Sequence, residues 1–210
     1  SLYQQFSVYG PSQNGYPALA PESSWGVDAG VDQSFADGRL TLGATLFYNR
    51  IRNLIDFDGS LPSKASFGGQ YVNIARARTQ GIELAADAII APDLLRVKAS
   101  YTWLDAIDLT SGKALPRRAD HQGKISIAWS PVQKLTIEPT LYLVGERFSN
   151  RNEVDRLRPY ARLDARVAYQ VTPNVEIYAR AENLTNTRYE EIKNYGVTGR
   201  AIYGGVKATW

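Results

Sequence analysis

Apolar and polar residues alternate with a period of two along most of the chain, in runs of about ten residues. The run at 95–104 places its apolar side chains on one side and Arg96, Lys98, Ser100 and Thr102 on the other. A helix would scatter these polar side chains around its circumference, so the period predicts a strand with one apolar face. Further runs of this kind lie at 2–8, 27–35, 124–129, 135–143, 163–170 and 175–182.

The connections between these runs alternate between short and long. The short ones carry Gly, Pro, Asp or Asn and lie at 36–39, 91–93, 130–134 and 172–174. The long ones lie at 10–24, 56–70, 109–121, 147–158 and 183–199. Antiparallel strands joined in this way have all short turns at one end and all long loops at the other, which is typical of outer-membrane barrels. The sequence therefore predicts an all-β fold, a transmembrane antiparallel β-barrel with about ten strands present.

Aromatic residues occupy both ends of the predicted apolar surface. Strands that run toward the short turns end in Phe35, Trp129, Tyr169 and Trp210. Strands that run the other way carry, near their far ends, Tyr48, Tyr101 and Trp103. Two aromatic girdles fit a membrane span, because such rings favour both interfaces of a bilayer. The alternative is a soluble β-sandwich or a lipocalin-like barrel, for which strands of this length are unusual.

The amino-acid composition argues against several classes of function. The 210 residues carry a net charge of +3 without a long basic run, which argues against a nucleic-acid binder that neutralises phosphates. One histidine and no cysteine remove most metal and thiol chemistry. No apolar run reaches the roughly 20 residues of a transmembrane helix, whereas a barrel strand needs only about ten. Methionine is absent and no signal peptide precedes Ser1, so we expect an excerpt of a longer polypeptide, with 1–210 as one barrel segment.

Four stretches have the order and spacing of a known pattern. They are 21–30, which begins Pro-Glu-Ser-Ser; 46–55; Asn73 followed by Gly81-Ile82-Glu83; and a tail with 181–186, Tyr189, Tyr195, Gly199 and Arg200 before the aromatic Trp210. Together they resemble the C-terminal barrel region of TonB-dependent outer-membrane receptors, most closely the vitamin B12 (cobalamin) and siderophore transporters. Trp210 stands where that family more often has Phe and keeps the aromatic end.

The resemblance implies a function as well as a fold. Receptors of this family have a 22-stranded barrel that is filled by an N-terminal plug. On this basis we expect an active-transport receptor, not an enzyme, that imports cobalamin or a ferric siderophore across the outer membrane of a Gram-negative bacterium, with no cofactor. Its expected partners are outer-membrane lipid, the plug and the remaining strands, which this chain lacks, and TonB, which the missing N-terminal part would contact.

A set of charged residues is predicted to face the inside of the barrel. It consists of Asp28, Asp32, Glu83, Asp87, Arg96, Lys98, Lys124, Glu138, Asp164, Arg166, Glu176, Arg180 and Glu182. We interpret these as a polar wall and as plug contacts, since a lumen must be polar to be wet or plugged. Asn183, Gly199 and Arg200 are expected to shape the last loop. His121 has no nucleophile or second base to complete a catalytic set.

The long loops are the predicted place of ligand recognition. Their aromatic and polar side chains could hold a bulky, partly apolar, partly anionic chelate. The candidates are Phe67, Tyr71, Arg117, Arg118, Arg147, Phe148, Asn150 and Tyr195. Asp56 and Asp58 offer too few oxygens to specify a Ca²⁺ site, so no metal is predicted.

A second hypothesis is a self-standing outer-membrane barrel of about ten strands, which would act as a passive pore or a structural protein. The two hypotheses differ in the pairing of the end segments, 2–8 and 200–210. A closed small barrel requires that these segments pair with each other.

Overall fold

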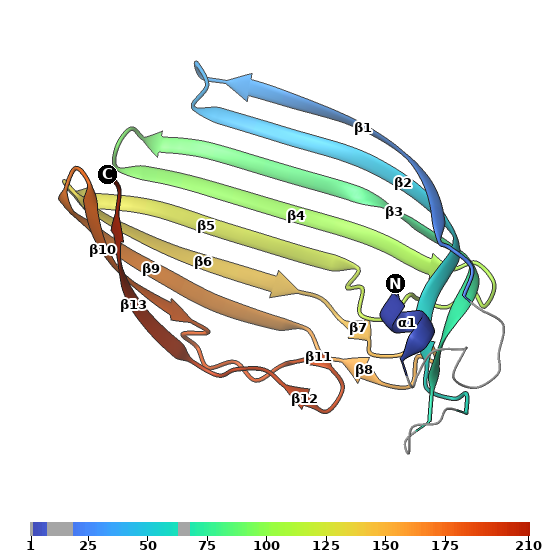
Figure 1. Ribbon diagram of the computed structural model, residues 1–210. Helices are drawn as coiled ribbons and strands as arrows, with labels where there is room; N and C mark the ends of the chain where they lie inside the picture. The colour runs from blue at the N-terminus through green and yellow to red at the C-terminus, as the bar shows by residue number, and fades with distance from the viewer. Residues whose placement is uncertain (1, 8–18, 63–67) are drawn as a thin grey trace.

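One antiparallel sheet of nine strands dominates the computed structural model, which describes residues 2–7, 19–62 and 68–210. The strands lie side by side in the order in which the chain forms them, and Figure 1 shows them as a curved wall. They are β1 Ser23–Phe35, β2 Leu40–Asp58, β3 Gln70–Ala91, β4 Leu95–Asp108, β5 His121–Val132, β6 Leu135–Val144, β9 Tyr160–Thr172, β10 Val175–Glu182 and β13 Ala201–Ala208. The predicted antiparallel all-β fold is confirmed.

The predicted asymmetry of the connections is also confirmed. Turns of two to four residues join the strands at one end, at 36–39, 92–94, 133–134 and 173–174. Long connections join them at the other end, and two of these contain small hairpins. The hairpins are formed by β7 Arg147–Phe148 with β8 Arg156–Leu157 and by β11 Glu190–Ile192 with β12 Tyr195–Gly196. In Figure 1 the short turns gather on the left, beside the C-terminus.

The prediction of a strand at 2–8 is wrong. Leu2–Phe6 form a single turn of helix, α1, in which the Ser7 amide donates to the Tyr3 carbonyl at 2.9 Å; Val8 lies outside the described residues. Leu2 and Phe6 are four residues apart, so over so short a segment the pattern fits a helix as well as a strand. Within the described residues the sheet therefore has nine strands, not about ten. No helix in the described part of the chain has the length and apolar character needed to cross a bilayer.

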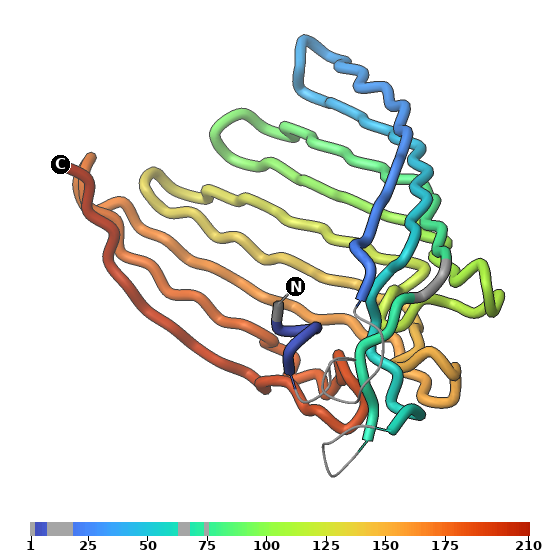
Figure 2. Tube along the Cα trace, turned by 45° about the vertical axis from the view of Figure 1, so that its right-hand side comes forward, coloured from blue at the N-terminus to red at the C-terminus, as the bar shows by residue number. Residues whose placement is uncertain are grey.

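The sheet is open. Within the described residues β1 pairs only with β2, and β13 pairs only with β10. Figure 2 shows the two edge strands well separated. The closed ten-stranded barrel that the second hypothesis requires is thus not formed by these strands.

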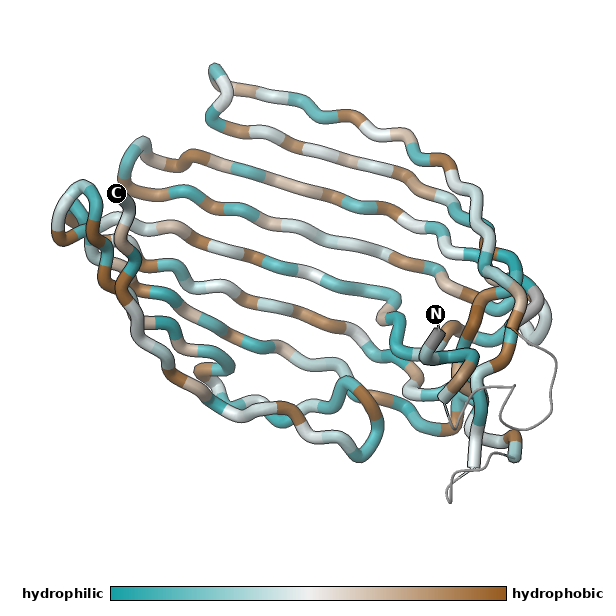
Figure 3. The backbone as a smooth tube through the Cα atoms, in the orientation of Figure 1, coloured by the Kyte–Doolittle hydropathy of each residue, from teal (hydrophilic) through white to brown (hydrophobic). Residues whose placement is uncertain are grey.

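The two faces of the sheet differ in chemistry. We call the face that carries Val31, Leu46 and Val206 the outer face; these side chains are 60–68% exposed. Figure 3 shows hydrophilic and hydrophobic residues as teal and brown bands along the strands. Successive side chains of a strand point to opposite faces, so the opposite, inner face carries the polar set. A continuous apolar surface of this extent requires a non-aqueous neighbour.

Charged side chains lie on the inner face, as the sequence predicts, and several of them form ion pairs. Arg166 on β9 lies between two carboxylates, with Glu138 on β6 at 3.1 Å and Glu176 on β10 at 2.5 Å. Near the short turns Arg96 makes a two-point contact with Asp87, at 2.6 and 2.5 Å. Each cation bridges neighbouring strands, so the inner charges compensate one another across the sheet.

The main buried cluster lies at the long-loop ends of β3 and β4 and consists of Ala77, Ala106 and, in the connection after β4, Leu115. The connection after β4 folds back so that the Leu115 amide donates to the Ala106 carbonyl at 2.8 Å. Ile51 and Leu54 both pack against this cluster, although strict alternation would place them on opposite faces. The left-handed backbone of Asn53, with φ of 55°, shifts the alternation between them.

Candidate ligand-binding site at the long-loop end

Three long connections brace one another beyond the strands. The Arg117 amide donates to the Phe148 carbonyl at 2.6 Å, and the Ala114 amide donates to Glu153 at 2.7 Å. The Lys193 amide donates to the Ser149 hydroxyl at 3.0 Å. These bonds join segments far apart in sequence, so the loops form one fixed rim.

Arg147 is the centre of this rim. Its side chain is 2% exposed and donates to the Glu190 carbonyl at 2.9 Å and to the Glu191 carboxylate at 3.0 Å. Its guanidinium lies 5.4 Å from the centre of the Tyr160 ring, and the Tyr160 hydroxyl donates to the same carboxylate at 2.6 Å. A buried guanidinium needs such partners, and here they fix β11 against the start of β9.

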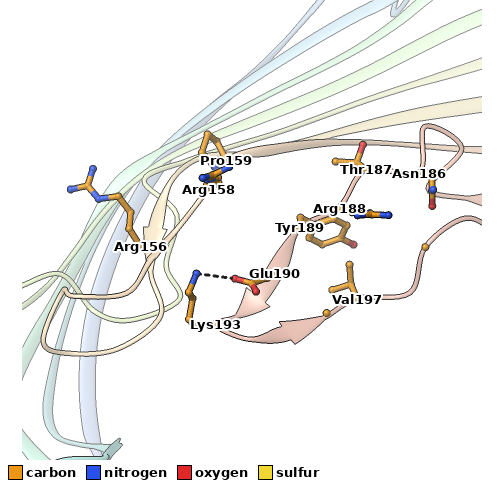
Figure 4. Close-up of a pocket in the computed structure, with 12 residues that line it drawn as sticks. Arg156, Arg158, Pro159, Asn186, Thr187, Arg188, Tyr189, Glu190, Lys193 and Val197 are labelled. Atoms are coloured by element: carbon orange, nitrogen blue, oxygen red, sulfur yellow. Dashed lines mark ion pairs between the residues drawn. The ribbon is translucent and has the colours of Figure 1, made fainter.

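A cavity of about 680 Å³ lies between the two small hairpins. Figure 4 shows its lining, with Tyr189 and Val197 at its border. Four lining residues are cationic: Arg156, Arg158, Arg188 and Lys193. Only one, Glu190, is anionic, and it pairs with Lys193 at 3.5 Å.

Two of these cations are free to meet a ligand. Arg156 pairs with Glu146 at 2.5 Å and stacks on Phe148, and in Figure 4 its side chain points away from the cavity. Arg158 and Arg188 have no ion pair or hydrogen bond to any described residue. The cavity thus combines apolar surface with excess positive charge, in the size range of small-molecule sites.

Beside this rim, Asp58 ends β2 and holds the adjacent turn. Its carboxylate accepts the Ser60 hydroxyl at 2.6 Å and the Ser60 amide at 3.0 Å, and Arg151 lies at 3.5 Å. Partial burial works to raise the pKa of this carboxyl, but the Ser60 hydrogen bonds and the charge of Arg151 together hold the pKa below its usual value. The described residues contain no group of three or more side chains able to hold a metal ion.

The structure distributes the predicted ligand candidates over several places. Arg117 and Arg118 line a small pocket with Asp56. Asn150 donates to Asp155 at 2.5 Å within its own loop. Tyr195 is 70% exposed on β12, and Phe67 lies outside the described residues.

Two further candidates belong to packed contacts. Tyr71 lies on β3, not in a loop, and meets Phe57 edge to face at 5.5 Å. Arg147 and Phe148 form β7, where the Arg147 side chain and the Phe148 carbonyl hold the rim. A ligand contact by any of the predicted residues stays a prediction.

The cavity residues were not among the candidates. Arg158 and Arg188 are 30 positions apart, so no local pattern connects them. The available signal was charge in the loop at 147–158, which carries four arginines and two acidic residues. The loop at 183–199 carries Tyr189 but has two basic and two acidic residues, so its charge gives no signal.

The predicted girdle residues lie where the alternation places them. Register puts Phe35, Trp129 and Tyr169 on the outer face near the short turns, and each is more than 40% exposed. At the other end Tyr48, Tyr101 and Trp103 share the outer face with Trp25, which was not among the predicted girdle residues. Trp210 follows β13 and is fully exposed. Their contact with an interface stays a prediction.

His121 also lies on the outer face, since it pairs with Trp103 across β4 and β5. Its Nδ1 is 2.7 Å from the Tyr101 hydroxyl, and the two rings stack. The geometry supports a structural role at the girdle.

Asn183 shapes the loop after β10, as predicted. It has a left-handed backbone, with φ of 50°, and its side chain is buried. Its amide oxygen accepts the Thr187 amide at 2.9 Å, and its nitrogen donates to the Thr187 carbonyl at 3.0 Å. This closed pair sets the path toward the cavity.

A family model described as "TonB dependent receptor-like, beta-barrel" matches residues 1–184. The chain belongs to this family of receptor barrels. Barrels of the TonB-dependent receptors lie in the outer membrane of Gram-negative bacteria, which accounts for the apolar outer face.

The sequence relatives are consistent with this family assignment. The Vitamin B12 transporter BtuB of Photobacterium profundum is 27% identical over 196 residues, which is 93% of this chain and 31% of that protein. The protein of the same name from Vibrio cholerae is 28% identical over 214 residues, with 97% and 31% covered. The chain thus spans about three tenths of the length of these curated relatives.

Solved structures of several receptors and transporters share the fold. The siderophore receptor PiuA from Acinetobacter baumannii has a TM-score of 0.70 at 20% identity, covering 91% of this chain and 29% of its own. The pyoverdine receptor FpvA from Pseudomonas aeruginosa has a TM-score of 0.67 at 20% identity, covering 92% and 30%. The copper transporter OprC has a TM-score of 0.75 at 18% identity, covering 90% and 32%. The predicted family resemblance is confirmed.

Proposed function

We propose that this chain is part of the barrel of an outer-membrane active-transport receptor that imports cobalamin or a ferric siderophore in a TonB-dependent manner. The observation that carries the proposal is the open sheet with an apolar outer face, an ion-paired inner face and unpaired edges. The names of the sequence relatives, which are vitamin B12 transporters, support the same function.

The unpaired edges indicate what completes the barrel. A strand edge in lipid leaves amide and carbonyl groups without partners, which costs several kcal/mol for each group. We infer that β1 and β13 pair with the remaining strands of a 22-stranded barrel. The inner face then contacts a plug, and TonB contacts a segment of the receptor outside these 210 residues.

The cavity between the small hairpins supplies a recognition site for this function. Arg158 and Arg188 provide unpaired guanidinium groups beside Tyr189 and Val197. Guanidinium groups bind carboxylate or phosphate oxygens by paired hydrogen bonds, and the apolar residues contact the body of a large ligand. The excess of positive charge favours an anionic ferric chelate, whereas the sequence relatives favour cobalamin.

Uptake into whole cells tests the proposal. Cells that depend on the complete receptor containing this chain are given labelled cyanocobalamin or a labelled ferric siderophore, with TonB present or deleted. We expect accumulation of one ligand class only when TonB is present. Equal uptake without TonB, or no uptake of either class, would overturn the proposal.

Two variants test whether the cavity binds the ligand. Replacing Arg158 and Arg188 together by alanine is expected to weaken ligand binding about tenfold or more, because two charge-assisted contacts are lost. Arg39→Ala, in the turn after β1 at the opposite end, is the control and should leave binding unchanged.

A further inference from the structure

The outer face of the sheet is uncharged over almost its whole area. In the part of the chain that the structure describes, register and alternation place five charged side chains there: Arg50, Arg52, Arg76, Arg78 and Asp105. Their orientation has independent support, because Ile51 and Ala77, the neighbours in sequence, pack in the buried cluster on the inner face. Successive side chains of a strand point to opposite faces, so these arginines point outward.

The four arginines form two opposed pairs on adjacent strands. Arg50 of β2 is directly across from Arg78 of β3, and Arg52 is directly across from Arg76. Side chains in such positions have Cβ atoms about 5 Å apart, and like charges there repel each other. Four cations are therefore concentrated on one small patch, which we call the arginine patch.

The positive charge of the arginine patch is only partly neutralised by neighbouring side chains. The carboxylate of Asp105 on β4 accepts hydrogen bonds from the Arg78 guanidinium at 2.6 Å and from the Gln80 side-chain amide at 3.0 Å. The side chains of Arg50, Arg52 and Arg76 have no ion pair or hydrogen bond to any described residue. The Nε atoms of Arg50 and Arg78 are buried and lack a hydrogen-bond partner. Three positive charges are left for a group outside this chain.

The patch lies just beyond the aromatic girdle. Trp25 is directly across from Arg50, and Trp25 and Tyr48 have ring centres 5.6 Å apart. Arg50 follows Tyr48 by two residues, a rise of about 7 Å along the strand. Aromatic girdles lie at the level of lipid headgroups, so the arginines reach the charged layer of the bilayer.

The long loops of such barrels are extracellular, so this charged layer belongs to the outer leaflet. We propose that the arginine patch binds the phosphate groups of a phosphorylated glycolipid in the outer leaflet. Planar guanidinium groups match phosphate oxygens with paired hydrogen bonds, and a phosphate between opposed arginines removes their repulsion. The inference rests on the outer-membrane location of the family and is independent of the transported ligand.

The test uses the complete outer-membrane protein that contains this chain, purified in mild detergent, and fluorescent bis-phosphorylated lipid A as the probe. The parent protein is expected to bind this probe at least tenfold more tightly than dephosphorylated lipid A. Inorganic phosphate at the same concentration should not displace it. Equal affinity for the two lipids, or displacement by inorganic phosphate, would overturn the proposal without any variant.

Variants then locate the site. Replacing Arg50, Arg52 and Arg76 by glutamine spares the Arg78–Asp105 pair and is expected to weaken lipid A binding about tenfold or more. Arg180→Gln, which removes an inner-face cation paired with Glu182, is the matched control and should bind as the parent does. Arginine-to-lysine changes at the same three positions keep the charge and should weaken binding less. If the glutamine variant binds lipid A with the affinity of the parent protein, the patch is excluded as the site. Uptake of the transported ligand should be retained in the glutamine variant.

Discussion

Asn73 holds the main chain of Ala20 by two hydrogen bonds: its Nδ2 donates to the Ala20 carbonyl at 3.0 Å, and its Oδ1 accepts the Ala20 amide at 2.8 Å. The same Nδ2 donates to the Asn53 carbonyl at 2.7 Å. A side-chain amide thus replaces a strand partner where β2 extends beyond the start of β1. Glu22 extends this arrangement by accepting the Ile55 amide at 2.6 Å.

Removal of the Asn73 amide should release the segment before β1. In Asn73→Ala three hydrogen bonds are lost, each worth about 1 kcal/mol. We expect the Ala20 amide to exchange with solvent about 10 to 100 times faster, as measured by hydrogen exchange. Asn49→Ala, on the same strand as Asn53 but without a bond to this segment, should leave that rate unchanged. An unchanged rate in Asn73→Ala would mean that other contacts hold the segment.

The surroundings of Gly81 leave no room for a side chain. A Cβ at this position would overlap the backbone carbonyl of Trp103 and would lie 2.7 Å from the Phe47 ring, which faces Gly81 across the strands. Gly81→Ala should therefore lower the free energy of unfolding by about 1–3 kcal/mol. Urea unfolding of the folded receptor measures this effect.

Gly123 provides the matched control for Gly81. A Cβ there would meet the Leu143 side chain at 3.7 Å and the Ser100 carbonyl at 3.8 Å, which are ordinary contacts. Gly123→Ala should change the free energy of unfolding by less than about 0.5 kcal/mol. Equal effects of the two substitutions would show that the glycines matter for backbone freedom, not for space.

The strands could be predicted from the sequence because each face has its own chemistry. In β4 the polar Arg96 and Lys98 alternate with apolar residues from Leu95 to Trp103, and lipid outside and charge inside both enforce that register. The turns followed from residues such as Asp37 and Gly38, whose left-handed backbone suits a tight connection. The family resemblance in 21–30 and 73–84 has a physical basis in Glu22, Asn73 and Gly81.

Other features depend on contacts that no local pattern encodes. Asn53 shifts the alternation of β2 by one left-handed residue, and a period-two analysis cannot detect a single such change. The cavity requires Arg158 and Arg188 to be brought together. This depends on Arg147, whose hydrogen-bond partners Glu190 and Glu191 lie more than 40 residues away. A single guanidinium in a loop looks the same whether it binds a ligand or the protein itself.

The turn held by Asp58 should respond to acid. The pKa of this carboxyl is below its usual value, so its contribution to stability is complete above the ordinary pKa of about 4 and is lost as the pH falls through the lowered pKa. We expect the Ser60 amide, after correction for intrinsic exchange, to lose protection in that acidic range. In Asp58→Asn the amide should show no such pH dependence. A parallel loss of protection in both proteins would assign the acid response to another group.

Arg147 is predicted to support the cavity without contacting the ligand. Arg147→Met keeps the apolar volume but removes the bonds to Glu190 and Glu191, so β11 should open more readily by about 2 kcal/mol. Hydrogen exchange across 190–196 measures this opening. Arg156→Met removes a cation whose partner Glu146 is half exposed, and should cost less than about 1 kcal/mol. Ligand affinity should fall in Arg147→Met in proportion to the opening of 190–196, because the binding-competent rim is then populated less. A loss of affinity without faster exchange would instead make Arg147 a direct ligand contact.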